Sequence, residues 1–557
     1  MKNDDSDVII IGSGAGGGTA AWALSRKGIK VTLLEAGPSY SALDYHLDKE
    51  GWEKSFPHKL NPNSSYLVAP MQKLAIENDD LRSWNHIQGR LNVTDTRQSQ
   101  GYHHVKGVGG SSLHFTGEAH RLNPLSFKHY SQHGVAADWP LSYQDLEPYY
   151  VEAETFVGVA GEQSFSETLG DRGHFQPAHN LSYASQHIAR GFDKCGLSIK
   201  KNSLAVLSRS KQGRPPCNYC GGCLRGCSVG DKGSIDITYI KSAIATGNCN
   251  VIANANVIKI EAAANDQVKG VYYEHQGLVK YAAAKTVIVA AGAVHTPRLL
   301  LNSSNQYCPD GLANESGQVG KNFMETVLWT SSGIIDKDIA SNRGLPVDFV
   351  CWDYNTPDSI DNIVGGCRFG PAQVESDIAG PISYSQRVVA GFGLEHKQQM
   401  RQAFGKVISI AGIAESLPNA GTFVKLSKQV DSLGLPLAEI HSYVDEGCLG
   451  RLRFMAKKSR EILAACDSIK TIEEFSSYDY FSSTHVFGTC RMGLEANSSV
   501  VDAYCRSHRW NNLYIMDTSV FPSTGGGESP GLTVQALTLR ACEKFAQSLK
   551  GSNSGKR

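Results

Sequence analysis

The chain has 557 residues, of which 41% are hydrophobic, so it is long enough for more than one domain with large apolar cores. Its 54 lysines and arginines equal its 54 aspartates and glutamates in number, and this balance excludes a net charge that would draw the chain to nucleic acid or an anionic membrane. No run of 18 or more uncharged apolar residues occurs, so no membrane span is predicted. We expect a small-molecule ligand.

Residues 7–37 predict a strand, a glycine-rich turn, a helix and a second strand. The first apolar strand covers residues 8–11, the helix covers residues 19–26, and the second strand covers residues 31–34 and ends at Glu35. An acidic residue at the end of the second strand is where a dinucleotide-binding unit places an acceptor for ribose hydroxyls. The order of these elements therefore predicts dinucleotide binding, with either FAD or NAD as the ligand.

The glycines of that turn each have a physical role. Gly12 permits a tight turn, Gly14 lets the backbone approach a pyrophosphate, and Gly17 lets the helix lie close to the sheet. The helix N-terminus adds free N–H groups and a positive dipole end for the phosphates. We therefore expect Gly12, Gly14, Gly17 and Glu35 to bind the cofactor.

A second glycine-rich loop lies at residues 103–117 and contains Gly109, Gly110 and Ser111. Its exposed backbone can approach an anion or a planar ring. Two such loops in one chain favour a large cofactor over a mononucleotide.

Further motifs follow these two in an order that resembles the glucose-methanol-choline (GMC) oxidoreductase family, in the branch of the FAD-dependent sugar dehydrogenases and pyranose oxidases. The likeness extends from residue 7 to residue 540. It is carried by the glycine turn with Glu35, the GGSS loop at 109–112, WP at 139–140, LEPYY at 146–150, GAVHTPRLL at 292–300, VGKN at 319–322, HVFGTCRMG at 485–493 and NLYIMDTSVFP at 512–522.

The resemblance implies FAD and an α/β fold, α+β overall: a Rossmann-like FAD-binding domain with an inserted antiparallel-sheet substrate domain. The FAD-binding domain is expected to be discontinuous, with residues 1–120, 200–325 and 485–557, and the substrate domain to comprise residues 121–199 and 326–484.

Hydrophobic patterns agree with this division. Apolar runs predict buried strands at residues 286–290 and 513–517, and a helical period runs over residues 532–549. Short apolar runs between residues 325 and 480 predict an antiparallel sheet whose face covers the flavin. Its expected strands lie at residues 409–415, 422–426 and 438–443.

Four of the 14 cysteines lie within the loop at residues 216–228, spaced C-x2-C-x2-C-x3-C. This is the spacing of a bacterial-type iron–sulfur run, and it predicts Cys217, Cys220, Cys223 and Cys227 as metal ligands. Among the similar sugar dehydrogenases, cysteines placed like two of these belong to an iron–sulfur motif, whereas similar long-chain alcohol oxidases carry a cysteine-rich segment without a known cluster. A structural thiol or disulfide loop and a zinc site are the alternatives.

His485 is the first residue of the family's His-x-x-Gly-Thr motif, and the resemblance makes it the catalytic base. A histidine suits this role because its ordinary pKa of about 6.5 leaves a neutral form available at pH 7. The alternative is a buried histidine that only satisfies a core hydrogen bond.

The partner position departs from the family pattern. Ser529 stands where members usually have Asn or His ahead of Pro-x-Leu-Thr. A serine hydroxyl is able to donate a hydrogen bond to the substrate oxygen, although it is shorter than an amide. Glu528 supplies a carboxylate as the alternative, so both residues are candidates for the catalytic site.

His114 matches a histidine of the pyranose oxidases that is joined covalently to the flavin. We expect it to lie over the flavin ring or to cap the loop, with a covalent link as the alternative. The resemblance also places Val257, Asp517 and Pro530 at the cofactor. His103, His104, His120 and His295 belong to no pattern and are interpreted as ordinary surface or core histidines.

These observations favour an FAD-dependent oxidoreductase that oxidises a CH–OH group of a sugar, glycoside or other alcohol by hydride transfer, with an acceptor other than O2. An O2-using oxidase with a structural cysteine loop and a non-redox lyase that keeps FAD as a scaffold are the alternatives. An iron–sulfur cluster would imply an electron-transfer protein as partner. The six residues before Asp7 hold no apolar signal segment, which predicts the cytoplasm, with the periplasm as the alternative if a partner subunit carries the signal.

Overall fold

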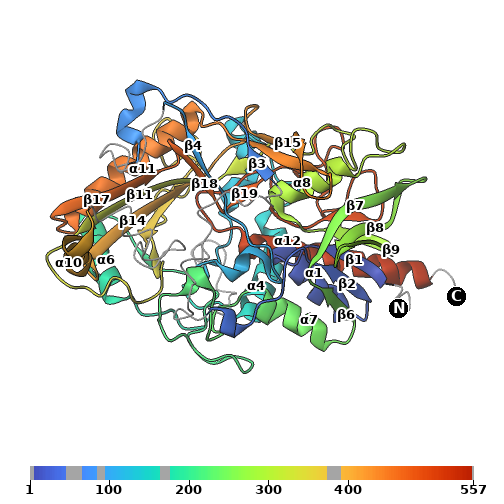
Figure 1. Ribbon diagram of the computed structural model, residues 1–557, viewed down its shortest axis with the longest axis horizontal. Coiled ribbons are helices and arrows are strands. Elements are labelled where there is room, and N and C mark those ends of the chain that lie inside the picture. The colour runs from blue at the N-terminus through green and yellow to red at the C-terminus, as the bar shows by residue number, and fades with distance from the viewer. Residues whose placement is uncertain (1–5, 46–65, 84–94, 163–175, 373–390, 555–557) are drawn as a thin grey trace.

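The computed structural model describes residues 6–45, 66–83, 95–162, 176–372 and 391–554. A parallel sheet with its helices forms one end of the molecule, and an antiparallel sheet with its helices forms the other (Figure 1). Segments that are far apart in the chain meet between these two ends.

The parallel sheet is assembled from three stretches of the chain. Its order is β6-β2-β1-β9, and β20 pairs with β9 in parallel. The apolar run of β1 is buried on both faces, as expected for a central parallel strand. β7 and β8 extend β9 as an antiparallel ribbon. The bounds are β1 Ser6–Ile11, β2 Val31–Leu34, β6 Cys249–Ile252, β7 Ala255–Ala263, β8 Gln267–His275, β9 Leu278–Val289 and β20 Leu513–Ile515.

Helices α1 (Ala15–Ser25), α12 (Gly531–Ser554) and α4 (Tyr143–Val157) pack against one another beside this sheet. Residues 121–199 were predicted to belong with the substrate domain, but the part of this range around α4 packs with the parallel sheet. Trp139, with the apolar face of α4, is buried in the same core as β1 and α12. The sequence around α4 predicts a helix but does not show which of the two cores its apolar face joins.

The antiparallel sheet has the order β13-β14-β11-β17. Helix α11 packs across β11 and β14, and α6 lies against α11. Its core includes Trp329, Phe369 and Leu452, all fully buried. The bounds are β11 Val327–Ile334, β13 Cys367–Pro371, β14 Val407–Ala414, β17 Lys470–Ser476, α6 Tyr183–Lys194 and α11 Glu446–Ala465.

Two of the three strands predicted for that sheet lie elsewhere. β15 (Phe423–Val430) and β16 (Pro436–His441) form a separate sheet with β3 (Tyr66–Val68). Their apolar residues are buried against helix α8 (Gly292–Asn302). Period-2 alternation identifies strands but does not specify which sheet they join, so the existence of these strands was predictable and their pairing was not.

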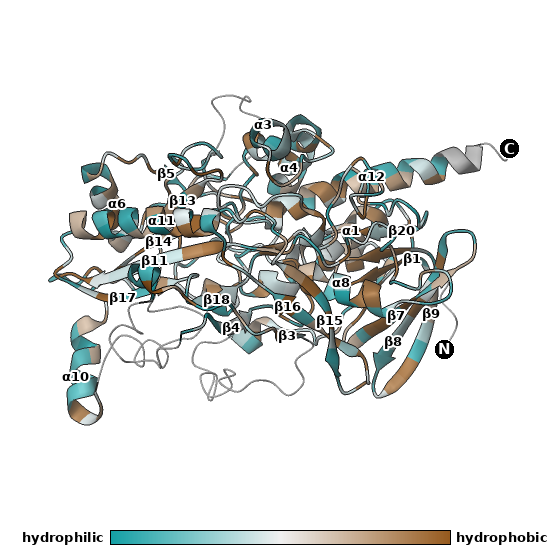
Figure 2. Ribbon diagram, turned by 90° about the horizontal axis from the view of Figure 1, so that it is seen from above, coloured by the Kyte–Doolittle hydropathy of each residue, from teal (hydrophilic) through white to brown (hydrophobic). Residues whose placement is uncertain are grey.

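The remaining elements are short, apart from α10, which projects from the body of the molecule (Figure 2). No helix of the described ranges combines the length and apolar character that a bilayer span requires. The bounds are η1 Ala42–Tyr45, η2 Ile76–Leu81, β4 Gln98–Tyr102, η3 Gly110–Leu113, η4 Pro124–Lys128, α3 His129–His133, β5 Lys200–Lys201, η5 Cys223–Arg225, η6 Asp236–Ile240, α7 Lys241–Ala245, β10 Met324–Glu325, β12 Phe349–Val350, α10 Gly393–Ala403, β18 Tyr480–Ser483, β19 Val486–Phe487 and η7 Thr518–Val520.

Helix α1 lies so close to the turn before it that Gly17 has no room for a side chain. A Cβ atom there would overlap the carbonyl oxygen of Gly12. We expect Gly17→Ala to lower the free energy of unfolding by roughly 3 kcal/mol, as overpacking of a rigid core does, measured by urea unfolding of the cofactor-free protein. Gly14→Ala is the matched control, because a Cβ at Gly14 would meet nothing within 4 Å. Equal stabilities of the two variants would contradict this account of the turn.

Candidate active site

A cavity of about 1580 Å³ lies between the two ends of the molecule, and residues of the parallel sheet, the glycine loops and the antiparallel sheet line it. Most of the predicted site residues reach this cavity. They are Gly12, Gly14, Glu35, Gly110, Ser111, His114, Val257, His485, Asp517, Ser529 and Pro530. Gly17, Gly109, Glu528 and the four loop cysteines are not among the residues that line it.

The two glycine loops meet at the end of the cavity next to helix α1. A Cβ atom on Gly110 would lie 2.8 Å from the Cα atom of Gly14, so the two backbones are in contact. Helix α1 begins after Gly14 with no side chain capping it. Its first N–H groups therefore remain available for an anion in the cavity.

Glu35 holds the second strand to both glycine loops. Its Oε2 accepts hydrogen bonds from Ser13 N at 3.0 Å and Ser13 Oγ at 2.6 Å, and its Oε1 accepts one from Gly37 N at 2.9 Å. Ser13 Oγ in turn accepts a hydrogen bond from Gly109 N at 3.0 Å. A backbone hydrogen bond from Gly107 adds to these three, so Glu35 joins the second strand to both loops. Burial raises the pKa of Glu35.

Asp517 has a similar role at another part of the cavity lining. Its Oδ2 accepts hydrogen bonds from Gly292 N at 2.9 Å and Thr296 Oγ1 at 2.6 Å, while its Oδ1 accepts one from Ser519 N at 2.8 Å. Burial raises the pKa of this carboxyl group. Asp517 thus fixes the start of helix α8 to the segment that follows β20.

His485 lines the cavity from the segment between β18 and β19. Its backbone carbonyl accepts hydrogen bonds from Thr326 N at 3.1 Å and from Ser483 Oγ at 3.0 Å, which fixes the position of the residue. Burial lowers the pKa of the His485 imidazole to about 4, with Glu118 raising it and Arg368 lowering it. The imidazole is therefore neutral at pH 7 and able to accept a proton.

Ser529 is held by Glu118, a residue that the sequence motifs did not indicate. Ser529 Oγ donates a hydrogen bond to Glu118 Oε2 at 3.0 Å, and Arg368 Nη2 donates to the same oxygen at 2.8 Å. Glu118 and Arg368 also line the cavity. The hydroxyl proton of Ser529 is thus committed to Glu118, and the expected donation to a substrate oxygen is not what the structure shows.

His120 fixes the backbone of Ser529, although it was interpreted as an ordinary histidine. Its Nδ1 accepts a hydrogen bond from Ser529 N at 3.1 Å, and its Nε2 donates to Asn202 Oδ1 at 2.8 Å. Burial lowers the pKa of His120 to about 4, in agreement with a neutral ring protonated at Nε2. The only signal for its role in the sequence is its closeness to Glu118, directly after the second glycine loop.

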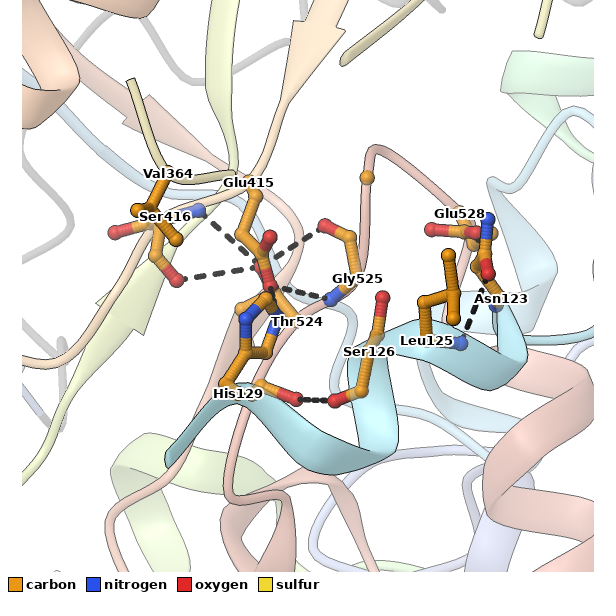
Figure 3. Close-up of polar contacts among 12 residues, drawn as sticks. Asn123, Leu125, Ser126, His129, Val364, Glu415, Ser416, Thr524, Gly525 and Glu528 are labelled. Carbon is orange, nitrogen blue, oxygen red and sulfur yellow. Dashed lines mark hydrogen bonds and ion pairs between the residues drawn. The ribbon is translucent and has the colours of Figure 1, made fainter. Parts of the chain in front are cut away.

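Glu528 points away from the cavity. Its Oε1 accepts hydrogen bonds from Asn123 N at 3.0 Å and Asn355 Nδ2 at 2.9 Å. Figure 3 shows it beside Asn123, with Gly525 between it and Glu415. Within the described part of the chain, Oε2 of Glu528 has no hydrogen-bond partner. Burial raises the pKa of this carboxyl group to about 7, so Glu528 is a buried core acid in this structure and does not meet the expectation of a catalytic carboxylate.

The cysteine loop does not form the predicted metal site. No three His, Cys, Asp or Glu side chains of the described ranges lie together in a way that could hold a metal ion. Cys220 is exposed, whereas Cys223 is buried. Cys227 Sγ donates to Asp231 Oδ1 at 3.1 Å, and burial raises the pKa of the Cys223 thiol to about 12.

The same loop serves as a wall of the cavity. Leu224 and Arg225 line it, and His114 Nδ1 donates a hydrogen bond to the carbonyl oxygen of Leu224 at 2.7 Å. Fully buried Lys232 donates to three carbonyl oxygens, those of Leu113 at 2.9 Å, Phe115 at 3.0 Å and Cys223 at 2.6 Å. Lys232 therefore joins the cysteine loop to the second glycine loop.

Two sequence models of the GMC oxidoreductase family match this chain, one over residues 5–327 and the other over residues 418–538. The chain belongs to the GMC oxidoreductase family. The sequence-based prediction of an oxidoreductase of this family is confirmed.

Two relatives and one solved structure are similar to this chain over almost its full length. The 2-methyl-1,2-propanediol dehydrogenase of Mycolicibacterium austroafricanum is 27% identical over 97% of this chain and 94% of its own. The fructose dehydrogenase large subunit of Gluconobacter japonicus is 29% identical over 99% of this chain and 100% of its own. The crystal structure of pyridoxine 4-oxidase from Mesorbium loti, 18% identical, superposes with a TM-score of 0.63 over 98% of this chain and 99% of the other. The predicted fold class is confirmed.

Family membership implies FAD, and the cavity fits it. Gly14 and the uncapped start of α1 leave room and free N–H groups for the pyrophosphate, and Glu35 lines the cavity at the end of β2. The two touching glycine loops form one continuous backbone surface. Gly12, Gly14, Glu35, Gly110, Ser111, Val257, Asp517 and Pro530 are the residues that would hold the cofactor.

Glu528 makes stability depend on pH near neutrality. Because the folded protein holds this proton to about pH 7 and an ordinary Glu titrates at 4.5, the free energy of unfolding decreases as pH rises from about 4.5 to about 7 and is constant above. We expect Glu528→Gln to remove this decrease, so that the variant gains roughly 3 kcal/mol relative to wild type between pH 5 and pH 8. Urea unfolding at each pH measures it.

Glu495→Gln, at an exposed position, is the control and is expected to follow the wild type at every pH. A Glu528→Gln variant with the wild-type pH dependence would contradict the assignment.

The cysteine loop makes a prediction about thiol reactivity. We expect iodoacetamide to alkylate exposed Cys220 in the native protein, and buried Cys223 only after unfolding, because burial keeps the Cys223 thiol protonated and inaccessible. Peptide mass spectrometry on anaerobically purified protein reads out the labelling. Buried Cys505 is the internal control. Four protected loop cysteines together with about three or four irons per chain, released by a chelator, would contradict the structure of the loop.

Proposed function

We propose that this GMC oxidoreductase is an FAD-dependent dehydrogenase that oxidises a CH–OH group of a sugar, glycoside or other alcohol and passes the electrons to an acceptor other than O2. The observation that carries this proposal is the neutral His485 imidazole in the same cavity as Ser529 and the Glu118–Arg368 pair. A base, charged groups for orientation and a cofactor cradle are what oxidation of an alcohol requires.

When bound, FAD supplies the acceptor for the hydride that leaves the carbinol carbon. His485 accepts the hydroxyl proton at a ring nitrogen, since neither nitrogen has a hydrogen bond to the described part of the chain. The charge of Glu118 favours the imidazolium that forms and the charge of Arg368 opposes it. The pair therefore adds little net charge, and burial decides that His485 starts the reaction neutral.

The names of the two relatives support the choice of donor and acceptor. Both are named as dehydrogenases, one for a diol and one for a sugar. One is named as a large subunit, which supports a protein partner that receives the electrons. The structure of the cysteine loop gives no support to an iron–sulfur relay within this chain.

We expect anaerobic mixing with a sugar or alcohol to reduce the flavin, and reoxidation by a quinone or ferricyanide to be at least ~10-fold faster than by O2. His485→Asn is expected to slow flavin reduction by 10²–10⁴-fold, the usual contribution of a general base. In the wild type the rate is expected to be constant from about pH 5 to pH 8 and to fall below about pH 4, where His485 becomes protonated. Stopped-flow absorbance at each pH measures all three.

His508→Asn is the control, because His508 lies outside the cavity lining and its ring bonds to Ser499 Oγ at 2.8 Å. Rapid reoxidation by O2 with formation of peroxide would make the protein an oxidase. No reduction by any sugar or alcohol would overturn the proposal altogether.

A further inference from the structure

The active site contains a buried pair of charges that proton abstraction by His485 does not need. Glu118 and Arg368 form an ion pair at 2.8 Å, and both line the cavity with His485 and Ser529. We propose that Glu118 and Arg368 bind a second hydroxyl group of the substrate, next to the one that is oxidised. The substrate class is then neutral vicinal diols and sugars, not simple alkanols. This inference rests on the proposed function.

The pair has unused hydrogen-bonding capacity of both kinds. Glu118 accepts hydrogen bonds from Ser529, Arg368 and Asn202, which leaves about one of its four acceptor positions. Arg368 donates through Nε to the carbonyl oxygen of Gly527 at 2.6 Å and through Nη2 to Glu118. Its Nη1 has no hydrogen-bond partner among the described residues, so three of its five N–H groups remain.

One acceptor beside several donors matches the chemistry of a neutral hydroxyl group. A hydroxyl donates one hydrogen bond and accepts up to two, so it can bind Glu118 and Arg368 together. A carboxylate would meet the negative charge of Glu118, and an ammonium group would meet the positive charge of Arg368. The pair therefore disfavours hydroxy acids and amino alcohols as well as plain alcohols.

Glu118 remains an acceptor at every working pH. Burial alone would raise its pKa, but the charge of Arg368 and the hydrogen bonds from Ser529 and Asn202 outweigh burial and lower the pKa to about 2. Ser529 turns its hydroxyl proton toward this carboxylate, so toward the cavity it offers acceptor positions. The donor on this side of the cavity is Arg368.

Glu118, Arg368 and His485 line one cavity, so a small molecule bound there is able to meet the base and the ion pair together. The charges of both Glu118 and Arg368 also act on the pKa of His485, in agreement with this shared cavity. An alkyl chain placed there would cover the free N–H groups of Arg368 without giving them an acceptor. Sites that bind a substrate hydroxyl in this way reject analogues that lack it.

Matched substrate pairs test the inference on the wild-type holoenzyme. Anaerobic flavin reduction is followed with 1,2-hexanediol against 1-hexanol and with a hexose against its deoxy analogue. We expect kcat/KM to be at least ~100-fold higher for the member with the additional hydroxyl. Equal values within each pair would overturn the inference and leave the proposed function intact. No reduction by any of these compounds would overturn both.

Variants test whether the preference for the additional hydroxyl arises from the Glu118–Arg368 ion pair. Glu118→Gln keeps the size of the side chain and removes its charge, and we expect the preference within each substrate pair to fall at least ~10-fold, mostly through KM. Glu474→Gln is the control, because Glu474 also lines the cavity but pairs with Arg460 at 2.8 Å. The flavin content of each variant reports folding. A preference unchanged in Glu118→Gln, or lost equally in Glu474→Gln, would overturn the assignment to Glu118, and the wild-type comparison remains decisive if Glu118→Gln does not fold.

Discussion

The buried ion pair between Glu118 and Arg368 is the interaction on which the active site depends. Glu118 follows the second glycine loop, Arg368 lies on β13 of the antiparallel sheet, and Arg368 also bonds to the carbonyl of Gly527 just before α12. Desolvating two charges is costly unless their remaining hydrogen bonds are made. Here Ser529 and Asn202 make several of them. The site therefore exists only when both ends of the molecule are assembled.

The active site has to keep its base neutral and also has to hold the cofactor, and different residues perform these two roles. The charges of Glu118 and Arg368 act on the pKa of His485 in opposite directions, so burial is the effect that decides that the imidazole is neutral. The cofactor cradle is built from backbone and from carboxylates that bond to backbone, as Glu35 and Asp517 do. Side-chain chemistry is concentrated at the other end of the cavity, where the substrate would lie.

Local patterns in the sequence predicted the parts of the site that depend on local structure. The apolar strand, Gly12, Gly14 and Glu35 lie within one βαβ unit, so their spacing determined their positions, and His485 stood in a recognisable motif. Glu118 and Arg368 are 250 residues apart, and neither belongs to a motif that would connect them. The direction of Glu528 was also not predictable, since neighbours on an irregular segment face different surroundings. The cysteine spacing indicated a metal site, but spacing does not show where each thiol points.

Ser529, which differs from the residues usual in the family, and the Glu118–Arg368 ion pair depend on each other. A serine in place of the family's usual asparagine or histidine offers a single hydroxyl proton, which it donates in a hydrogen bond to Glu118. An asparagine amide would have supplied both a donor and an acceptor to the cavity. In this chain the donor function passes to Arg368 and the acceptor function to Ser529 and Glu118. Because Arg368 is charged and fixed at two points, it orients a polar partner more strictly than an amide would. The shorter residue therefore does not weaken the site, since the ion pair behind it supplies the groups that the serine lacks.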